Sequence, residues 1–386
     1  MKAVPESQTG RGAAPKILYF VTEDWYFCSH RLPLASAAKA QGFDVAVVTR
    51  VHRHAATIEE AGIRLIPLPI SRGSRNPLGE WRILIRLYQL LHSERPDILH
   101  NVALKPVLYG ALVARLSNVK GMVNALAGLG HIFAVRERAG FMRRLVMLAF
   151  RVLIRGRGHI IVQNPDDLRL LERSQLASPE QITLIRGSGV DLTRFRPSEE
   201  PEGTPVVLLA ARLLWDKGVG DFVQAAGILK AQNLKARFVI VGAPDPENHA
   251  AIPKEQLEEW VASGHVEWWG QRSDMEKVFE ECTIFCLPSY YGEGVPKVLI
   301  EAAAAGKPIV TTDMPGCREV VKNDLNGLLI PPRNPKALAD AIGRLLKDGE
   351  RRKSMGVASR HRAVAEFGID SVTEATIELY RKILRT

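Results

Sequence analysis

Two successive series of short apolar runs, each run followed by a helical pattern, constrain the fold of this chain more than any other feature. In the first half, the apolar runs are rich in β-branched residues and the segments between them have helical periodicity. Such alternation favours a parallel sheet covered on both faces, because each right-handed crossover lays a helix on the sheet. The expected strands of this half are Lys16–Val21, Asp44–Thr49, Ile63–Pro67, Asp97–Asn101, Met122–Leu126 and His159–Gln163, and the expected helices include Leu32–Ala40, Leu78–Ser93, Pro106–Arg115 and Met142–Ile154.

The same alternation restarts after a polar segment, Ser198–Pro205, that is typical of a linker. The strands expected in the second half are Val206–Ala210, Arg237–Val241, Val266–Trp268, Thr283–Leu287, Pro308–Thr311 and Gly327–Ile330. A chain of 386 residues is long enough for two cores. We therefore predict an α/β fold with two doubly wound domains in series and a cleft at the C-terminal ends of their strands. The predicted boundaries are a flexible N-terminus at 1–15, an N-terminal domain at 16–195 and a C-terminal domain at 196–370, with the helix at 371–386 packing back on the N-terminal domain.

Composition argues against several other classes of protein. Hydrophobic residues make up 46% of the chain and charged residues 24%, which is typical of a folded, soluble protein. Four cysteines do not indicate a disulfide framework, and Cys282 and Cys286 share one face of an expected strand as buried thiols. The polar start of the chain and the lack of any apolar run of about 18 residues argue against a signal peptide and a spanning helix. We expect a cytoplasmic protein.

Positive charge is concentrated in the first half of the chain. Residues 1–195 carry a net charge of +12, whereas residues 196–386 carry −2. This asymmetry suggests an anionic surface or acceptor as the partner of the N-terminal domain. Nucleic acid is the rival partner, but the basic residues are not interleaved with aromatic ones as in a stacking platform, so we expect no nucleic acid.

The segment from Arg136 to Arg157 holds seven arginines and a single acid among many apolar residues. One interpretation is an amphipathic surface that meets anionic headgroups on the inner face of the cell membrane. The other is a crossover helix with a solvated basic face, which the alternation of strands and helices also requires. We favour the first interpretation because the excess charge lies in this half.

The segment Tyr291–Gly306 carries the sharpest chemical signal. An apolar strand runs into a glycine-containing loop, and a helix is expected to open at Pro296, since proline lacks the N–H that would stay unpaired there. A helix N-terminus preceded by glycine backbone is a natural seat for a diphosphate. Glu293 in the loop and Glu301 in the helix could accept hydrogen bonds from a transferred sugar and from a ribose. Alternatively, both glutamates are ordinary solvated residues.

Two further features favour the ligand-binding interpretation. Arg212 and Lys217 follow the expected strand Val206–Ala210, at the edge where doubly wound sheets bind ligands. Both cations could neutralise the charge that develops on a departing nucleoside diphosphate. The Gly-Ser-Gly-Val-Asp run at 187–191 supplies a flexible turn at the domain junction that is suited to a hinge.

Together with Pro-Gly-Cys-Arg-Glu at 315–319, these motifs closely resemble the group 1, or family 4, retaining glycosyltransferases. The resemblance extends from Lys16 to about Phe367. It implies the GT-B architecture of two facing Rossmann-like domains, with the nucleotide sugar on the second domain and the acceptor on the first. It also implies a catalytic set of Glu293, Arg212 and Lys217 within a donor-binding set of Arg212, Lys217, Gln271, Glu293, Gly294, Val295, Pro296 and Glu301.

The segment Thr22–Ala35 is similar to the first strand, loop and helix of bacterial enzymes that build surface polysaccharides, many of which extend sugars on undecaprenyl diphosphate. The similarity makes His30 and Arg31 candidates for acceptor or phosphate contacts, although a helix-start histidine and a solvated arginine would fit equally. Many relatives have His-Gly where this chain has Ala127-Gly128, so a commonly invoked catalytic histidine is missing, and His131 does not simply replace it. The remaining acceptor-side candidates are Lys105, Gly128, Gly130 and His131.

The sequence contains no Asp-x-Asp motif and no His/Cys cluster with metal-ligand spacing. We therefore expect metal-independent transfer that needs no cofactor, with retention as the resemblance implies. The expected donor is a UDP-sugar, with an N-acetylhexosamine as the first choice, and the expected acceptor is a polyprenyl-diphosphate-linked or other glycan. A nucleotide-sugar epimerase or hydrolase and a non-catalytic sugar-nucleotide-binding subunit are the alternatives. The intact cations and glutamates favour the transferase.

Overall fold

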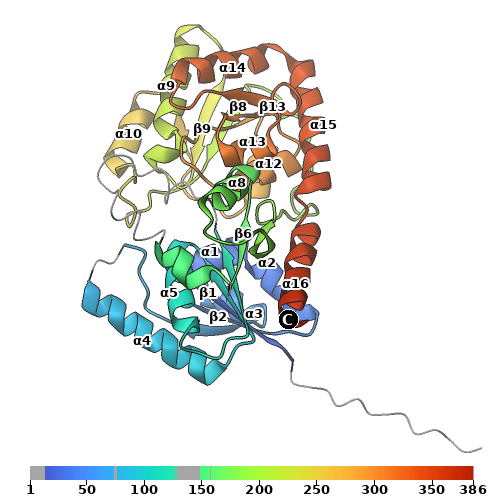
Figure 1. Ribbon diagram of the computed structural model, residues 1–386. Coiled ribbons are helices and arrows are strands. Elements are labelled where there is room, and N and C mark those ends of the chain that lie inside the picture. The colour runs from blue at the N-terminus through green and yellow to red at the C-terminus, as the bar shows by residue number, and fades with distance from the viewer. Residues whose placement is uncertain (1–13, 74–75, 127, 129–147, 157, 386) are drawn as a thin grey trace, which may run out of the picture. The chain divides into compact units, whose positions relative to one another are not determined.

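The computed structural model describes residues 14–73, 76–126, 128, 148–156 and 158–385 (Figure 1). The chain divides into two compact units, which consist of residues 1–71, 76–124 and 377–386 in the first unit and residues 72–75 and 125–376 in the second. The boundaries expected from the sequence, at 195 and 370, do not coincide with the limits of these units and stay a prediction.

The first unit is built on parallel strands with helices between them. Its strands are β1 (Lys16–Glu23), β2 (Asp44–Arg50), β3 (Arg64–Pro67), β4 (Ile98–Val102) and β5 (Gly121–Ala125, of which the last residue is counted with the second unit). Its helices are α1 (Asp24–His30), α2 (Leu32–Ala40), α3 (Ala55–Glu60), α4 (Pro77–Glu94) and α5 (Leu104–Ala114). β1 pairs in parallel with β2 and with β4, and Ile17 lies opposite Val45 on one side and Ile98 on the other.

With β6 (His159–Val162) and β7 (Ile182–Leu184), the sheet has seven strands in the order β3-β2-β1-β4-β5-β6-β7. A second sheet has six strands in the order β10-β9-β8-β11-β12-β13. Its strands are β8 (Val206–Ala210), β9 (Arg237–Val241), β10 (Glu267–Trp268), β11 (Ile284–Leu287), β12 (Ile309–Thr312) and β13 (Gly327–Ile330). The remaining helices are α8 (Pro165–Ser174), α9 (Val219–Ala231), α10 (Lys254–Ala262), α11 (Met275–Glu280), α12 (Lys297–Ala304), α13 (Pro315–Val320), α14 (Pro335–Lys347), α15 (Gly349–Glu366) and α16 (Ile369–Arg385), with 3₁₀ turns at Pro179–Gln181 and Trp215–Lys217.

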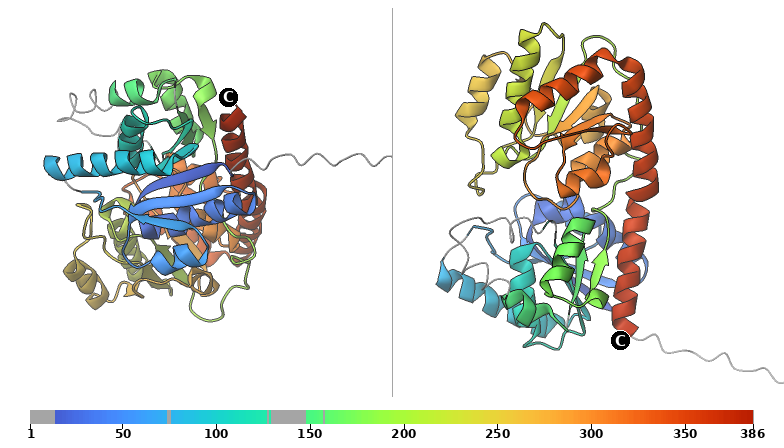
Figure 2. Two further views of the ribbon diagram at one scale, coloured as in Figure 1. Left: turned by 90° about the horizontal axis from the view of Figure 1, so that it is seen from below. Right: turned by 45° about the horizontal axis from the view of Figure 1, so that its top comes forward.

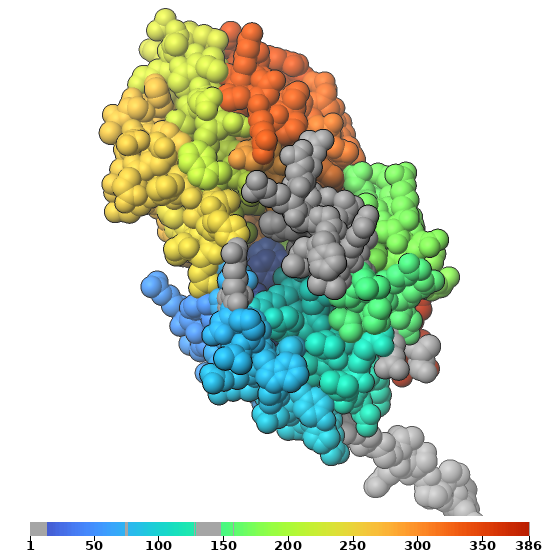
Figure 3. All heavy atoms as spheres, turned by 60° about the vertical axis from the view of Figure 1, so that its left-hand side comes forward, coloured from blue at the N-terminus to red at the C-terminus, as the bar shows by residue number. Residues whose placement is uncertain are grey.

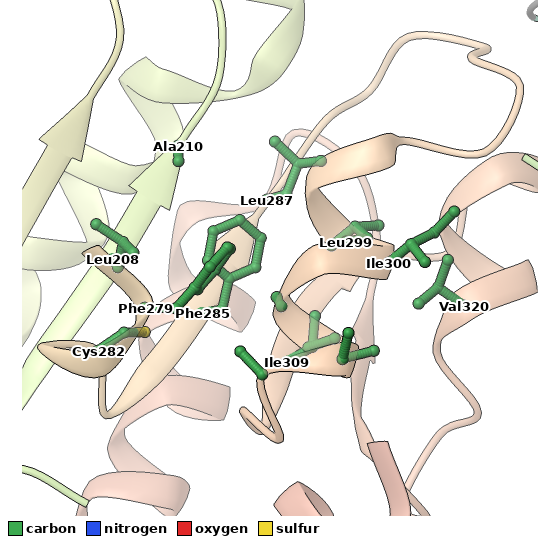
Figure 4. Close-up of a cluster of buried hydrophobic side chains, with 14 of the residues drawn as sticks. Leu208, Ala210, Phe279, Cys282, Phe285, Leu287, Leu299, Ile300, Ile309 and Val320 are labelled. Atoms are coloured by element: carbon green, nitrogen blue, oxygen red, sulfur yellow. The ribbon is translucent and has the colours of Figure 1, made fainter. Parts of the chain in front are cut away.

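Helix α12 is anchored by a buried apolar cluster between it and the second sheet. Figure 4 shows Leu299 and Ile300 of α12 near Leu287 of β11, Ile309 of β12 and Val320 of α13. Phe285 of β11 meets Phe279 of α11 edge to face, with ring centroids 5.5 Å apart. This cluster fixes the start of α12, and therefore the loop before it, relative to the ends of the central strands.

The C-terminal helix α16 is held in the first unit by hydrogen bonds between buried aromatic side chains. The hydroxyl of Tyr380 lies 3.0 Å from the hydroxyl of Tyr19 on β1 and 2.5 Å from Nδ1 of His100 on β4. Burial, with a smaller effect from Arg31, lowers the pKa of His100 well below its usual value. The end of the chain is thus tied to the two central strands of the first unit (Figure 2).

The predicted α/β fold with two parallel sheets is confirmed, and each strand predicted from the sequence is present within a few residues of its expected bounds. Two details differ. Strand β7 was not expected, and α12 begins at Lys297 with Pro296 as its N-cap. Of the expected helix Met142–Ile154, residues 142–147 lie outside the described residues, and residues 148–154 are helical. All four cysteines are free, and Cys282 and Cys286 are buried as predicted. Among the described helices, none has the length and apolar character needed to cross a membrane.

Candidate active site

Lys217 and Glu293 form an ion pair at the C-terminal ends of two adjacent strands of the second sheet. Lys217 ends the 3₁₀ turn after β8, and its Nζ donates to Oε2 of Glu293 in the loop after β11. Ser289, which is fully buried, donates from Oγ to Oε1 of the same carboxylate at 2.7 Å. The two ion-paired side chains are 13% and 17% exposed, so each remains reachable from solvent. Because β8 and β11 are neighbours in the sheet, the structure brings together two residues with separate predicted roles, Lys217 for the diphosphate and Glu293 for the sugar.

Gly218 allows the turn after β8 to approach the end of β11 closely enough for the Lys217–Glu293 ion pair to form. It has φ of +73°, and a Cβ at this position would lie 2.1 Å from the carbonyl oxygen of Pro288. Only glycine tolerates both the conformation and the approach. The backbone of the 3₁₀ turn is also bonded directly to the loop after β11, because Tyr290 N donates to Asp216 O at 3.0 Å.

The loop Glu293–Pro296 is packed between glycine backbones. A Cβ at Gly316, near the start of α13, would lie 1.4 Å from the carbonyl oxygen of Gly294, and one at Gly128 would lie 2.6 Å from the amide nitrogen of Gly294. Val295 donates its amide N–H to Oε1 of the buried Gln163 at 2.9 Å. The predicted acceptor-side residue Gly128 therefore lies against the predicted donor loop, and Gln163, which follows β6, is a contact that the sequence did not reveal.

Pro296 caps α12 instead of occupying its first helical position. Its carbonyl oxygen accepts from Leu299 N at 3.0 Å and from Ile300 N at 3.4 Å, which starts the helical hydrogen-bond pattern. In the first turn Lys297 contacts Glu301, with 3.2 Å between Nζ and Oε1. Glu301 is buried, and burial raises the pKa of its carboxyl group while Lys297 opposes that rise. Glu301 is therefore not the solvated helix residue of the alternative interpretation.

Arg212 lies in a second charge cluster, centred on Asp245 in the loop after β9. Nη1 of Arg212 lies 2.8 Å from Oδ2 of Asp245, and Arg72 binds both carboxylate oxygens at 3.0 Å. Burial favours a higher pKa for Asp245, but the hydrogen bonds from Arg72 and Arg212 hold that pKa below its usual value. Sequence reasoning found Arg212 but missed Asp245 and Arg72. The Arg212–Asp245 contact depends on β9 lying beside β8, and Arg72 is 173 residues from Asp245 in the sequence.

The loop after β10 contains Gln271 of the predicted donor-binding set. This side chain is exposed, and the neighbouring Arg272 is engaged by Asp274, with 2.7 Å between Nη2 and Oδ2. Cys317 of the Pro-Gly-Cys-Arg-Glu motif is buried, and burial first, then the Glu293 carboxylate, raise the pKa of its thiol to about 11. In the part of the chain that the structure describes, no three His, Cys, Asp or Glu side chains are grouped as metal ligands.

The acceptor-side candidates of the first unit have internal contacts. Arg31 lies between α1 and α2 and is only 5% exposed, so it is not the solvated arginine of the alternative interpretation. His30 stacks on Tyr26 with ring centroids 4.1 Å apart. Lys105 donates to Ser71 O at 2.6 Å and to Glu80 Oε1 at 2.8 Å. Gly130 and His131 lie outside the described residues, as do residues 136–147 of the basic segment.

Two buried acids at the end of β1 hold the loop after β2. Asp24 Oδ2 accepts backbone N–H groups from His52 at 2.6 Å and from Arg53 and His54 at 3.0 Å. Although burial favours a higher pKa, these hydrogen bonds hold the pKa of Asp24 below its usual value. Glu23 binds Arg50, with 2.8 Å between Oε1 and Nη2. Part of the Thr22–Ala35 motif therefore has a structural role.

Two family models match this chain. The model for group 1 glycosyl transferases matches residues 191–362, and the model for glycosyl transferase 4-like proteins matches residues 16–164. A Campylobacter jejuni N,N'-diacetylbacillosaminyl-diphospho-undecaprenol alpha-1,3-N-acetylgalactosaminyltransferase is 28% identical over 92% of this chain and 95% of its own length. An Escherichia coli UDP-Gal:alpha-D-GlcNAc-diphosphoundecaprenol alpha-1,3-galactosyltransferase is 24% identical over 88% and 89%.

Solved structures share the fold over nearly the whole chain. Sucrose-phosphate synthase from Thermosynechococcus elongatus aligns with a TM-score of 0.78 and 22% identity, over 96% of this chain and 99% of its own. Anabaena HepE in complex with UDP and glucose aligns with a TM-score of 0.78 and 17% identity, over 95% and 100%. With both family models matched and the GT-B fold present, this chain belongs to the group 1, or family 4, glycosyltransferases.

Proposed function

We propose that this glycosyltransferase moves a sugar from a UDP-sugar to a glycan carried on polyprenyl diphosphate, or to another saccharide acceptor, in the synthesis of bacterial cell-surface polysaccharide. The observation that carries the proposal is the Lys217–Glu293 pair beside the N-terminus of α12. The names of the Campylobacter and Escherichia relatives support the acceptor class, since both include a diphospho-linked undecaprenol.

An N-acetylhexosamine is the proposed donor sugar. The Campylobacter relative, which is an N-acetylgalactosaminyltransferase, supports this choice, whereas the Escherichia relative uses UDP-Gal. Glu293 would accept hydrogen bonds from the hydroxyls of the donor sugar and Glu301 from those of the ribose. UDP is the proposed nucleotide.

In the proposed reaction, the diphosphate replaces Glu293 as the partner of the Lys217 ammonium group. The bond between C1 of the sugar and the phosphate oxygen breaks with its electron pair passing to UDP, whose charge Lys217, Arg212 and the N-terminus of α12 stabilise. The acceptor hydroxyl bonds to C1 on the face that UDP leaves, and its proton passes to the departing phosphate oxygen. This order of events retains the anomeric configuration and needs neither a metal ion nor a cofactor.

A preformed pair is suited to this exchange. Without a donor, Glu293, whose carboxylate is held by Ser289, keeps the Lys217 ammonium group in place, so that little reorganisation is needed when the diphosphate arrives. The amide of Val295 is held by Gln163 in the same way. The freed Glu293 carboxylate then turns to the sugar, which links recognition of the sugar to recognition of the diphosphate.

The test is a panel of nucleotide sugars incubated with polyprenyl-diphosphate-linked acceptors and followed by mass spectrometry. We expect UDP release and a product heavier by one sugar only when the acceptor is present, at a rate that a metal chelator leaves unchanged. Release of UDP or epimerised sugar without acceptor would instead identify the hydrolase or epimerase. Tight nucleotide binding without turnover would identify a non-catalytic subunit.

The proposed acceptor is lipid-borne, so we also propose that the protein works at the cytoplasmic face of the cell membrane. The net charge of +12 in residues 1–195 supports attraction to an anionic surface. Of the basic segment that the sequence analysis favoured for this contact, only residues 148–156 are described, and there Leu148 and Val152 are exposed.

A further inference from the structure

Helix α4 of the first unit exposes a stripe of large apolar side chains. These residues, which we call the α4 stripe, are Leu78, Trp81, Ile85 and Tyr88, with exposed fractions of 72%, 63%, 43% and 39%. They are three, four and three residues apart, so they follow one side of the helix. Figures 1 and 2 show α4 along the outside of its unit, and Figure 3 shows the surface over this part of the chain, in light blue, uncovered.

The α4 stripe is not the side of the helix that packs on the hydrophobic core of the first unit. Ile83, Leu87 and Leu91 are buried in a cluster with residues of β1, β2 and β4, and they lie on the opposite side of the helix. A surface helix normally needs only one apolar side. The second apolar side, which includes an exposed tryptophan, indicates contact with something outside the unit.

Charge on the helix indicates what that contact is. Arg82 and Arg86 flank the stripe, are exposed, and form no ion pair with any residue that the structure describes. The two acids of α4 are already engaged, Glu80 by Lys105 at 2.8 Å and Glu94 by Arg64 at 2.6 Å. The outer side of α4 is therefore apolar and purely cationic, which complements a surface of anionic headgroups over hydrocarbon.

We propose that the α4 stripe docks this protein on an anionic lipid bilayer. The apolar side chains enter the boundary between headgroups and acyl chains, Trp81 and Tyr88 lie at the level of the headgroups, and Arg82 and Arg86 bind lipid phosphates. The inference rests on the proposed function in one respect, which is that a lipid-linked acceptor requires a membrane. It assigns the contact to α4, a helix outside the basic segment Arg136–Arg157. A symmetric contact between two copies is less favourable because it would bring the arginines of both copies together.

The test is flotation of the full chain with vesicles of phosphatidylcholine, with or without phosphatidylglycerol. We expect binding to the anionic vesicles, and we expect Leu78→Ser combined with Trp81→Ser to weaken it at least about tenfold, since two exposed apolar anchors are lost. Arg82→Ser combined with Arg86→Ser should weaken binding to anionic vesicles about twentyfold. It should leave the weak binding to neutral vesicles unchanged.

Matched controls come from the second unit. Val357 and Val364 of α15 are 59% and 52% exposed, and changing both to serine should leave vesicle binding unaltered. The charge control is Lys336→Ser combined with Lys347→Ser, two exposed lysines of α14. Trp81→Phe should keep binding but lose most of the quenching of tryptophan fluorescence by brominated lipids.

Two outcomes would overturn the proposal. The first is equal vesicle binding by the wild type and the Leu78→Ser, Trp81→Ser variant. The second is a dimer, seen in sedimentation equilibrium, that this variant dissociates, because the stripe would then be covered by a second copy. Failure of the proposed function is detected separately with a water-soluble, short-chain acceptor. On that acceptor the variant should match the wild type, whereas a wild type without transfer would refute the function and leave the docking surface standing.

Discussion

The cations of the second unit and those of the first unit are held in different ways. Lys217 and Arg212 are paired with carboxylates at strand ends and are 13% and 42% exposed, and we propose that an incoming diphosphate takes the place of Glu293 at Lys217. Arg31 is buried between two helices, and Lys105 is held by Glu80 and a backbone carbonyl. Exposure alone does not separate the two ion pairs, since Lys105 and Glu80 are each 18% exposed. What separates them is the position of the carboxylate, because Glu293 follows the neighbouring strand β11 whereas Glu80 belongs to helix α4.

The largest effect is expected at the pair itself. Lys217→Ala and Glu293→Ala should each lower the rate of sugar transfer at least about a hundredfold, because each removes a charge that acts on the diphosphate or the sugar. The double variant should be little worse than either single one, since the two residues act as a unit. Initial rates of UDP release measure all three variants. Near-wild-type rates in both single variants would refute the assignment.

A large effect on stability, but not on the donor site, is expected at the end of β1. Asp24→Ala removes the acceptor of four backbone N–H groups and should lower the free energy of unfolding of the chain by about 3 kcal/mol at pH 7. The affinity for UDP should not change. Urea unfolding and calorimetry measure the two quantities, and a loss of UDP affinity at full stability would contradict the structural role.

The pH dependence of that effect has a definite sign. Because the folded-state pKa of Asp24 lies below its usual value of 3.8, its ionised form contributes stability above that pH, and the contribution is lost as pH falls through the folded-state pKa. The difference in unfolding free energy between the wild type and Asp24→Asn should therefore shrink between pH 5 and pH 2, in a series of urea titrations. A difference that grows on acidification would exclude a depressed pKa.

A smaller effect is expected at Asp245, which positions Arg212. Asp245→Ala should raise the KM for the donor about tenfold while changing kcat less than threefold, because it loosens a diphosphate ligand without removing it. Arg72→Ala should act in the same direction through Asp245. An unchanged KM with a lowered kcat would show that Asp245 has a different role.

The smallest effect is expected at Lys105. Lys105→Met should lower the unfolding free energy by about 1 kcal/mol, as expected for a half-buried ion pair, and should keep the transfer rate within threefold of the wild type. A hundredfold loss of transfer would move Lys105 back among the acceptor-binding residues and would remove the contrast between the two units.

Much of the fold could be predicted from the sequence because buried parallel strands are continuous apolar runs. Strand β7 was not predicted because Ile182–Leu184 is only three residues long and lies half-buried at the edge of the sheet. The expected start of helix α12 was one residue too early. The fixed φ of Pro296, about −61°, suits an N-cap as well as the first helical position.

The contacts of the site residues could be predicted only in part. The motifs pointed to Lys217, Glu293 and Glu301, but the ion pair between the first two depends on β8 lying beside β11, and the Arg212–Asp245 contact depends on β9 lying beside β8. Neither neighbour relation follows from local sequence. Arg31 resembled a loop residue, yet α1 extends to His30, so that Arg31 falls between two helices and inside the unit.

The proposed reaction requires the Lys217 ammonium group to leave Glu293 and bind the nucleoside diphosphate. Isothermal titration of UDP into the wild type, Lys217→Met and Lys105→Met tests it most directly. We expect the dissociation constant to rise at least about tenfold in Lys217→Met, as the loss of one charged hydrogen bond implies, and to stay unchanged in Lys105→Met. Equal dissociation constants for all three proteins would contradict it.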